Sequence, residues 1–220
     1  MIKLKKKCLI LDHDDTLINS QETIHYPIFL ETLRLLRPDE PEISFEDFVL
    51  LTNEYGFEGF IKNIYSFSEE EIAIEVSMWR EKVNLKQAKP FEDVQRLVCD
   101  YFDHGGIVIV YSYSEAFMIE KDYDRLFGRL PHGIIGYDVP PHERKPARSG
   151  ILKTIAQFDL SVKDCLLIDD MPMMIETAKR TNMDMVGACW AKGAKIQWKD
   201  LDVAVPLCED ASCLRSLIFY

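Results

Sequence analysis

The chain has 220 residues, of which 47% are apolar and 29% are charged. These proportions are ordinary for a globular protein and exclude long disorder, collagen and a coiled coil as the main class. The length allows one large domain, or a core with an insert. Lys and Arg number 26 against 37 Asp and Glu, a formal net charge of −11. This balance argues against a nucleic-acid partner, because nucleic-acid affinity rests largely on Lys and Arg.

No apolar run approaches the roughly 18 residues of a membrane span. The basic start of the chain is followed by a short apolar run, Cys8–Leu11, and then at once by Asp12. A signal peptide needs a longer apolar run. We therefore expect a cytoplasmic protein with no membrane partner.

The six cysteines form no CxxC pair and lie mostly in apolar segments. Free buried thiols are therefore expected in preference to zinc ligands or disulfides. The cysteines are Cys8, Cys99, Cys165, Cys189, Cys208 and Cys213.

Short, uniformly apolar runs predict strands that are buried on both faces, as in a parallel sheet. The clear runs are Cys8–Leu11, Ile107–Tyr111 and Cys165–Ile168; weaker ones are Ile134–Ile135, Met185–Cys189 and an edge strand at Val203–Val205, ended by Pro206. Amphipathic helical patterns over 93–102, 151–158 and 173–183 alternate with them. This alternation predicts an α/β fold, a Rossmann-like doubly wound parallel sheet with right-handed crossovers.

Residues 20–88 contain no convincing strand. Their hydrophobic periodicity predicts amphipathic helices over Ile24–Leu36, Phe45–Tyr55, Gly59–Tyr65 and Glu69–Val83. The pattern predicts a helical insert after the first strand. We therefore expect an α/β core of residues 1–18 and 89–220 and a helical cap of residues 19–88.

Polar segments follow the three clear strands directly. They are Asp12–Thr16, Ser112–Ser114 and Asp169–Asp170. Because ligands bind beyond the carboxyl ends of strands in an open parallel sheet, these segments should meet at one crevice. The carboxylates gathered there would repel one another, so either their pKa values rise or a cation is present. Oxygen ligands without a nearby His or Cys set favour Mg²⁺.

A phosphate ligand at this crevice would need a positive side chain. Lys145 lies in a polar loop ahead of the third acidic strand. A single Lys in such a loop is most often solvated, but its position in the chain favours a place at the crevice.

Taken together, these residues resemble the haloacid dehalogenase superfamily of phosphohydrolases. Asp12–Leu17 resembles the DxD(G/D)TL motif, and Ser112 matches the Ser/Thr after the second strand. Lys145-Pro146 matches the third motif and Asp169-Asp170 the acidic fourth. The resemblance covers nearly the whole chain. The position of the insert is similar to the first type of helical cap, as in phosphoglycolate phosphatases and β-phosphoglucomutases.

The sequence departs from the family pattern in places. Where many members read GDSxxD, Met174 replaces the second acid, and Asp169 would supply a carboxylate through a water instead. Arg148 and Asn182 replace a frequent proline and a frequent glycine. His13, between the two aspartates, is interpreted as a polar bystander.

The resemblance implies hydrolysis of a phosphate monoester through an aspartyl phosphate. Asp12 would be the nucleophile and Asp14 the general acid and base. Ser112 and Lys145 would hold the phosphoryl oxygens, with Tyr113 beside them. Mg²⁺ would be held by the metal ligands Asp12, Asp14 (through its carbonyl), Asp170 and Asp169.

Several alternatives stay open. A phosphomutase uses the same core residues, and a catalytically silent protein could bind a phosphate ligand on this fold. A dehalogenase normally lacks the acid at Asp14, and a phosphoreceiver domain has a different motif order.

The substrate is expected to be a small phosphorylated metabolite, selected by cap residues such as Tyr55 and Phe57 in the loop between two cap helices. These rings could equally belong to the core of the cap. The expected assembly is a monomer or weak homodimer.

Overall fold

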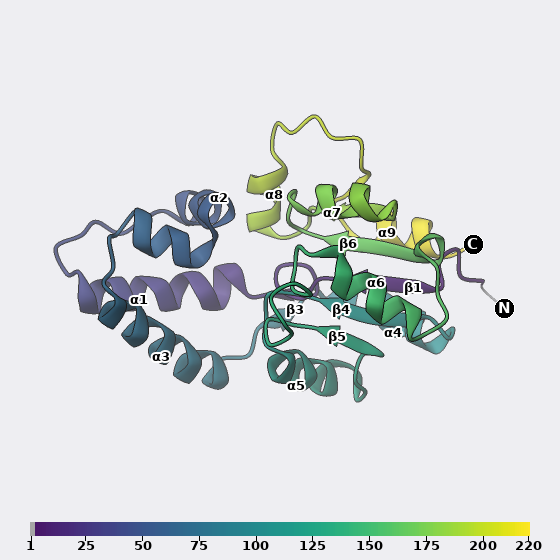
Figure 1. Ribbon diagram of the computed structural model, residues 1–220, viewed down its shortest axis with the longest axis horizontal. Helices are drawn as coiled ribbons and strands as arrows, with labels where there is room; N and C mark the ends of the chain where they lie inside the picture. Colours follow the sequence, from purple (N-terminus) through teal and green to yellow (C-terminus); the bar gives the residue numbers. More distant parts are fainter. Residues whose placement is uncertain (1–2) are drawn as a thin grey trace.

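A six-stranded parallel sheet organises the chain, as the computed structural model of residues 3–220 shows; the side chain of residue 84 is not described (Figure 1). The strand order is β5-β4-β1-β6-β7-β8. The strands are β1 (Cys8–Leu11), β4 (Ile107–Tyr111), β5 (Gly133–Ile135), β6 (Cys165–Asp169), β7 (Asp184–Ala188) and β8 (Leu207–Cys208). The first strand is therefore central, and Leu11 is aligned with Val110 of β4 and Ile168 of β6. This register brings the segments after the three strands to one edge of the sheet.

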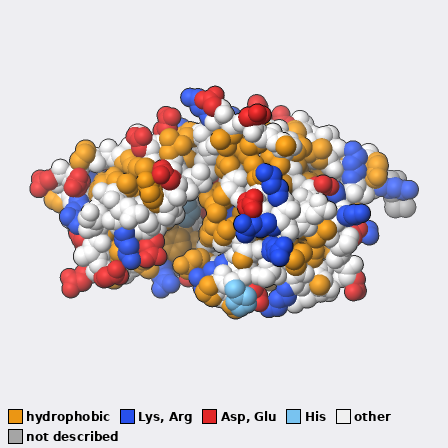
Figure 2. All heavy atoms as spheres, turned by 45° about the horizontal axis from the view of Figure 1, so that its top comes forward, with side chains coloured by type: hydrophobic (Ala, Val, Ile, Leu, Met, Phe, Trp, Pro, Cys, Tyr) orange, Lys and Arg blue, Asp and Glu red, His pale blue; other side chains and the backbone are white. Residues whose placement is uncertain are grey.

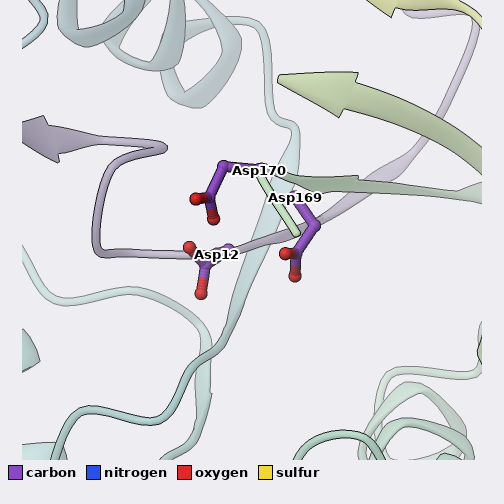
Figure 3. Close-up of side chains that lie close together, drawn as sticks. All are labelled: Asp12, Asp169 and Asp170. Atoms are coloured by element: carbon purple, nitrogen blue, oxygen red, sulfur yellow. The ribbon is translucent and has the colours of Figure 1, made fainter. Parts of the chain in front are cut away.

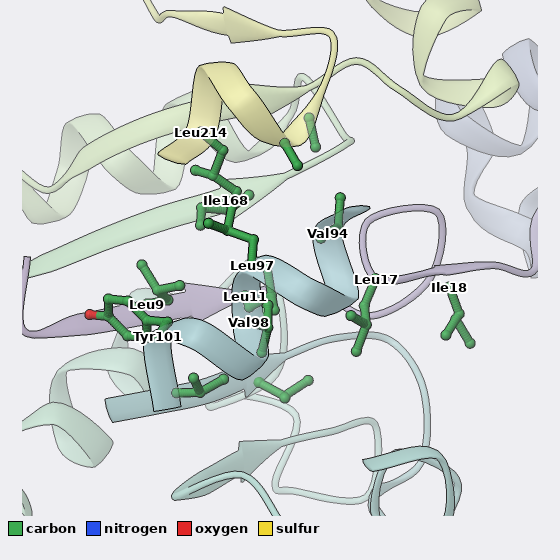
Figure 4. Packing of buried hydrophobic residues seen from close by; sticks show 14 of the residues in the cluster. Leu9, Leu11, Leu17, Ile18, Val94, Leu97, Val98, Tyr101, Ile168 and Leu214 are labelled. Carbon is green, nitrogen blue, oxygen red and sulfur yellow. The ribbon is translucent and has the colours of Figure 1, made fainter. Parts of the chain in front are cut away.

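Helices cover both faces of the sheet, which confirms the doubly wound α/β prediction. One face packs against α4 (Glu92–Asp103), α5 (Ala116–Phe127) and α9 (Ala211–Ile218); the other packs against α6 (Arg148–Ala156), α7 (Met174–Thr181) and α8 (Lys192–Trp198), and a 3₁₀ turn, η2 (Val162–Asp164), precedes β6. Side chains of β1 alternate between the two cores. Leu9 and Leu11 pack with α4 residues such as Leu97 (Figure 4), whereas Ile10 faces the other side. Uniformly apolar strands are the expected result of this two-sided burial.

The helices of the insert form a lobe beside the sheet (Figure 1). A π-helical turn η1 (Gln21–His25) leads into α1 (Tyr26–Leu36), α2 (Phe45–Asn63) and α3 (Glu69–Leu85). We call α1, α2 and α3 the α1–α3 lobe. Its own core is built around the buried rings of Phe29, Phe48 and Phe60. Two short strands, β2 (Ile18–Asn19) and β3 (Lys89–Pro90), pair antiparallel where the chain leaves and re-enters the sheet region.

The two helices expected over 45–65 are present as the two arms of α2, which meet at a kink at Gly56. Gly56 has φ 67° and ψ 162°, so the helical direction changes there within α2. Only glycine adopts this backbone region readily, which explains why the break falls at this residue. Ser44 and Ser68 cap the N-termini of α2 and α3 by accepting from Asp47 N and Glu71 N.

The predicted edge strand at Val203–Val205 is wrong. These residues have no strand conformation, and the edge strand β8 follows Pro206 instead of preceding it. Val203 and Val205 are partly buried against the α6–α8 side of the core. The carbonyl of Pro206 accepts from Gly187 N at 2.9 Å, so the proline begins the edge pairing, a place where its missing N–H costs nothing.

The expectation of free thiols is wrong for two of the six cysteines. Cys208 at the end of β8 and Cys213 in α9 form a disulfide, with Cα atoms 5.4 Å apart. Asp210 caps α9 by accepting from Ser212 N and Cys213 N, and this tight turn returns the chain to Cys208. The other four cysteines are free.

Across residues 3–220, the helices are each too short or too polar to cross a membrane.

Candidate active site

Three buried carboxylates meet at the carboxyl edge of the sheet. Asp12 follows β1, Asp169 ends β6 and Asp170 comes next; oxygen atoms of all three lie within 4.8 Å of one another (Figure 3). The relative exposures are 3% for Asp12, 0% for Asp169 and 4% for Asp170. The structure thus brings together the first and fourth motifs, as the strand register requires.

Lys145 enters this cluster from the loop before α6. Its Nζ lies 3.0 Å from Asp12 Oδ1 and 2.7 Å from Asp169 Oδ2, and the side chain is buried. Burial alone would lower the pKa of Lys145, but Asp12 and Asp169 raise it above its ordinary value. The ammonium therefore stays protonated, and Lys145 is placed at the crevice rather than in solvent.

One ammonium does not balance three carboxylates. Burial, together with the neighbouring Asp12, raises the pKa of Asp170 well above its ordinary value. Burial raises the pKa of Asp169 as well, although Lys145 opposes the rise. A closely packed all-oxygen donor set with excess negative charge fits a hard divalent cation such as Mg²⁺.

The side chains after β4 line the same space. Ser112 is 2% exposed, and its Oγ accepts from Ser114 N at 3.1 Å. Tyr113 is half-exposed, and Lys145 Nζ lies 5.4 Å from its ring centre. Both residues border the cavity that Asp12, Lys145 and Asp170 also line.

The Asp14 carboxylate lies outside the three-carboxylate cluster and is held by hydroxyl and imidazole donors. Ser20 Oγ donates to Oδ1 at 2.6 Å, and Ser114 Oγ donates to Oδ2 at 2.5 Å. His25 Nε2 lies 3.3 Å from Oδ1. Burial alone would raise the pKa of Asp14, but the hydrogen bonds from His25 and Ser114 hold it well below its usual range. In the absence of a ligand, Asp14 is thus an ionised carboxylate at the cavity.

The ring of His25 connects Asp14 to the α1–α3 lobe. Trp79 Nε1 on α3 lies 3.1 Å from His25 Nδ1. An indole N–H can only donate, so Nδ1 must be the unprotonated nitrogen. The proton of a neutral His25 is then on Nε2, from which it donates to Asp14. Neither His25 nor Trp79 belongs to a motif, and the sequence analysis did not identify them.

Two further residues of the first motif, Asp15 and His13, make hydrogen bonds to neighbouring elements of the fold. Asp15 has a positive φ of 54°, and its Oδ1 accepts from Ser20 N and Gln21 N, which caps η1. Burial raises the pKa of Asp15 to about 7. His13 Nε2 lies 3.2 Å from Asp122 Oδ2 of α5, and His13 does not line the cavity.

A cavity of about 400 Å³ separates the carboxylates from the α1–α3 lobe. Figure 2 shows the surface hollowed between the lobe and the sheet region, with hydrophobic side chains at its border. On the lobe side, Phe48, Phe57 and Trp79 line it. Of the two aromatic residues proposed to select substrate, Phe57 borders the cavity, whereas Tyr55 does not and is 42% exposed.

Met174 packs in the core instead of facing the site. It is fully buried among the residues of the α6–α8 side of the sheet. Asp169 makes a direct contact with Lys145 and its Oδ1 accepts from Met171 N at 2.9 Å. The two adjacent acids of the fourth motif therefore differ in their surroundings. Asp169 contacts Lys145, whereas Asp170 lines the cavity.

Comparison with known proteins agrees with this geometry. The sequence profile of the haloacid dehalogenase-like hydrolases matches residues 9–188. The chain belongs to this family. The resemblance drawn from the four motifs, and the prediction of a hydrolase, are thereby confirmed. No curated protein sequence matches the chain.

Solved structures share the fold of this haloacid dehalogenase-like hydrolase over almost its whole length. One is a predicted phosphoglycolate phosphatase from Haemophilus somnus, with 15% identity, TM-score 0.75, and 97% of this chain and 98% of that chain covered. Another is CbbY from Rhodobacter sphaeroides in complex with phosphate, with 14% identity, TM-score 0.74, and coverages of 95% and 96%. A mutant CbbY in complex with xylulose-(1,5)bisphosphate is similar at 13% identity, TM-score 0.73, and coverages of 94% and 95%.

Proposed function

We propose that this hydrolase cleaves a small phosphate monoester through a covalent phosphate on Asp12, and that it depends on Mg²⁺. The observation that carries the proposal is the ion pair of Asp12 with Lys145 at the floor of the cavity, beside Asp169 and Asp170. Family membership and the phosphate-containing neighbour CbbY support it. The α1–α3 lobe would form most of the cap over the site, which would comprise residues 19–88.

The proposed reaction has two steps. Asp14 takes up a proton as the substrate binds. An oxygen of Asp12 forms a bond to phosphorus as the bond from phosphorus to the ester oxygen breaks, and Asp14 gives its proton to the leaving alcohol. The oxygen of a water molecule then forms a bond to phosphorus as the bond from phosphorus to Asp12 breaks, and the water gives a proton to Asp14. This step releases inorganic phosphate and regenerates the Asp12 carboxylate. Lys145 and Ser112 would hold the phosphoryl oxygens during both steps. Such positioning and charge neutralisation supply most of the catalysis in phosphoryl transfer.

The residues that would hold Mg²⁺ are Asp12 and Asp170, with the carbonyl of Asp14, and with Asp169 through a water. When bound, the ion would neutralise phosphoryl charge. Asp169 has a second role in this proposal, because its contact with Lys145 fixes the ammonium next to Asp12.

The first test measures release of nitrophenolate and inorganic phosphate from p-nitrophenyl phosphate, with millimolar Mg²⁺ and with excess chelator. We expect Mg²⁺-dependent release of both products, with loss of turnover by at least about 10³-fold in Asp12→Asn. Asp39→Asn, at an exposed position of the lobe, is the matched control. Full turnover in chelator, or an active Asp12→Asn, would contradict the proposal. Nitrophenolate release without phosphate release, with transfer to an added alcohol, would indicate a phosphomutase.

A further inference from the structure

A single acidic side chain on the lobe side of the cavity has no counterpart in the four motifs. Glu75 lies on α3, is 2% exposed and lines the cavity opposite the carboxylate cluster. No described residue makes a hydrogen bond or an ion pair with it. A buried carboxylate without a partner is costly unless something in the site compensates its charge. Burial accordingly raises its pKa to about 7.

The cationic side chains that line the cavity are engaged elsewhere. Lys145 is paired with Asp12 and Asp169, and Arg80 Nη2 lies 3.3 Å from Glu115 Oε1. His25 is close enough to lower the pKa of Glu75, but its ring nitrogens contact Trp79 and Asp14. None of the cationic side chains described along the cavity is therefore a dedicated counter-charge for Glu75.

The cavity wall that includes Glu75 also presents a buried amide oxygen and aromatic rings. Asn53 Oδ1 is buried without a partner, and Asn53 lines the same cavity. The rings of Phe48, Phe57 and Trp79 complete this side. A carboxylate and an unsatisfied amide oxygen that line one cavity with aromatic rings suit a hydrogen-bond donor with positive charge, which both carboxylate and aromatic surfaces attract.

We propose that Glu75 is a specificity residue that binds a protonated amine on the alcohol part of the substrate, so that the preferred substrates are phosphate monoesters of amino alcohols. A neutral hydroxyl could donate to Glu75 but would leave its charge uncompensated. A second anionic group would be repelled. This preference would separate the chain from the mutant CbbY, whose named ligand xylulose-(1,5)bisphosphate carries a second phosphate. The inference rests on the proposed phosphatase function and adds its substrate class.

The test compares kcat/KM for aminoalkyl phosphates with two to five carbons against alkyl phosphates in which a methyl group replaces the ammonium. Phosphoglycolate is the anionic comparison. We expect at least one aminoalkyl ester to be preferred over its alkyl partner by about tenfold or more, and phosphoglycolate to be the poorest substrate. This comparison uses the wild-type protein alone, so it does not depend on the folding of a variant.

The assignment to Glu75 is tested with Glu75→Gln, which keeps the shape of the side chain and removes its charge. The amine preference should fall to about onefold in this variant. Glu81→Gln, at an exposed position of the same helix, should keep the wild-type preference. Thermal unfolding of both variants checks that they fold.

The outcomes separate the two proposals. Failure of the wild type to hydrolyse p-nitrophenyl phosphate with Mg²⁺ overturns the proposed function. If that ester is hydrolysed but no aminoalkyl ester is preferred, the amino-alcohol assignment is wrong. If the preference persists in Glu75→Gln, the amine is bound by another residue and the role of Glu75 is wrong.

Discussion

On the sheet side of the cavity, Asp12 and Asp169 share the ammonium of Lys145, whereas on the α1–α3 side Glu75 has no hydrogen-bond or ion-pair partner among the described residues. Both sides bury carboxylates, but only the first also buries a cation beside them. The ion pair of Asp12 with Lys145 can therefore keep its charges in the absence of a ligand, whereas the carboxylate of Glu75 needs a ligand to compensate its charge. This difference suggests that the reaction machinery is preformed, while the lobe provides substrate selection.

Asp14 joins the two sides, because its donors come from both. Ser114 follows β4, whereas His25 precedes α1 and is held by Trp79 of α3. A change in the lobe at Trp79 can therefore alter a carboxylate of the sheet side without touching it. Asp14 is therefore the residue at which the lobe can influence the reaction machinery of the sheet side most directly.

The largest expected effect is at Asp14 itself. Asp14→Asn removes the proton acceptor while keeping the backbone, so turnover should fall by about 10²–10⁴-fold. With p-nitrophenyl phosphate the first step needs no acid, and the loss should lie in hydrolysis of the phosphoenzyme. Steady-state and pre-steady-state kinetics with this ester measure both steps. Turnover at the wild-type rate would show that Asp14 is not the proton carrier.

The next effect separates the two acids of the fourth motif. Asp170→Asn should raise the Mg²⁺ concentration for half-maximal turnover by about 10–100-fold, because Asp170 is the proposed direct ligand. Asp169→Asn should raise this Mg²⁺ concentration less, and its main effect should be to weaken the contact that positions the Lys145 ammonium. Titration of turnover with Mg²⁺ gives both values. Equal shifts, or a larger shift in Asp169→Asn, would reverse the assignment.

The pH dependence of stability tests the uncompensated charge of Glu75. Its folded-state pKa of about 7 lies above the ordinary value of 4.5, so the folded state binds the proton more tightly. The protonated Glu75 side chain stabilises the folded state below pH 4.5, and this contribution is lost as the pH rises through about 7. The unfolding free energy of wild type relative to Glu75→Gln should fall by at most about 3 kcal/mol between pH 4.5 and pH 8. Urea unfolding at both pH values measures it, and a constant difference would contradict the burial argument.

The smallest expected effect is at Trp79. Trp79→Phe removes the donor to His25 Nδ1, so the ring can adopt the other tautomer and stop donating to Asp14. We expect kcat for alkyl phosphates to fall by about tenfold, and by less for p-nitrophenyl phosphate, which needs no acid in its first step. The ratio of the two kcat values is the readout. An equal loss on both esters would indicate a packing defect only.

Local patterns in the sequence predict the sheet side well. The strands at β1, β4 and β6 are continuous apolar runs, and the acids that follow them must meet once the strands are parallel. The helices α5, α8 and α9 were not predicted, and the edge strand was placed on the wrong side of Pro206. Turn geometry at Asp210 decided the pairing of Cys208 with Cys213, and that geometry is not visible in residue spacing.

The cavity residues of the lobe side could not be predicted from local sequence patterns. Glu75 lies in a helix rich in acids, with Glu69, Glu70 and Glu71 in its first turn, so its sequence suggests one more solvated carboxylate. Its burial depends on how α3 packs above the cavity. His25 and Trp79 are 54 residues apart and meet only through tertiary contact. The sequence predicts the break near Gly56, but which of Tyr55 and Phe57 borders the cavity depends on the direction of the kink.

The most direct test of the central claim is mass spectrometry of Asp14→Asn after mixing with p-nitrophenyl phosphate and Mg²⁺. We predict a mass increase of one phosphoryl group that alkali removes and that peptide mapping places on Asp12. The double variant Asp12→Asn with Asp14→Asn should show no such increase. A phosphoryl group on any other residue, or its persistence in the double variant, would contradict covalent catalysis at Asp12.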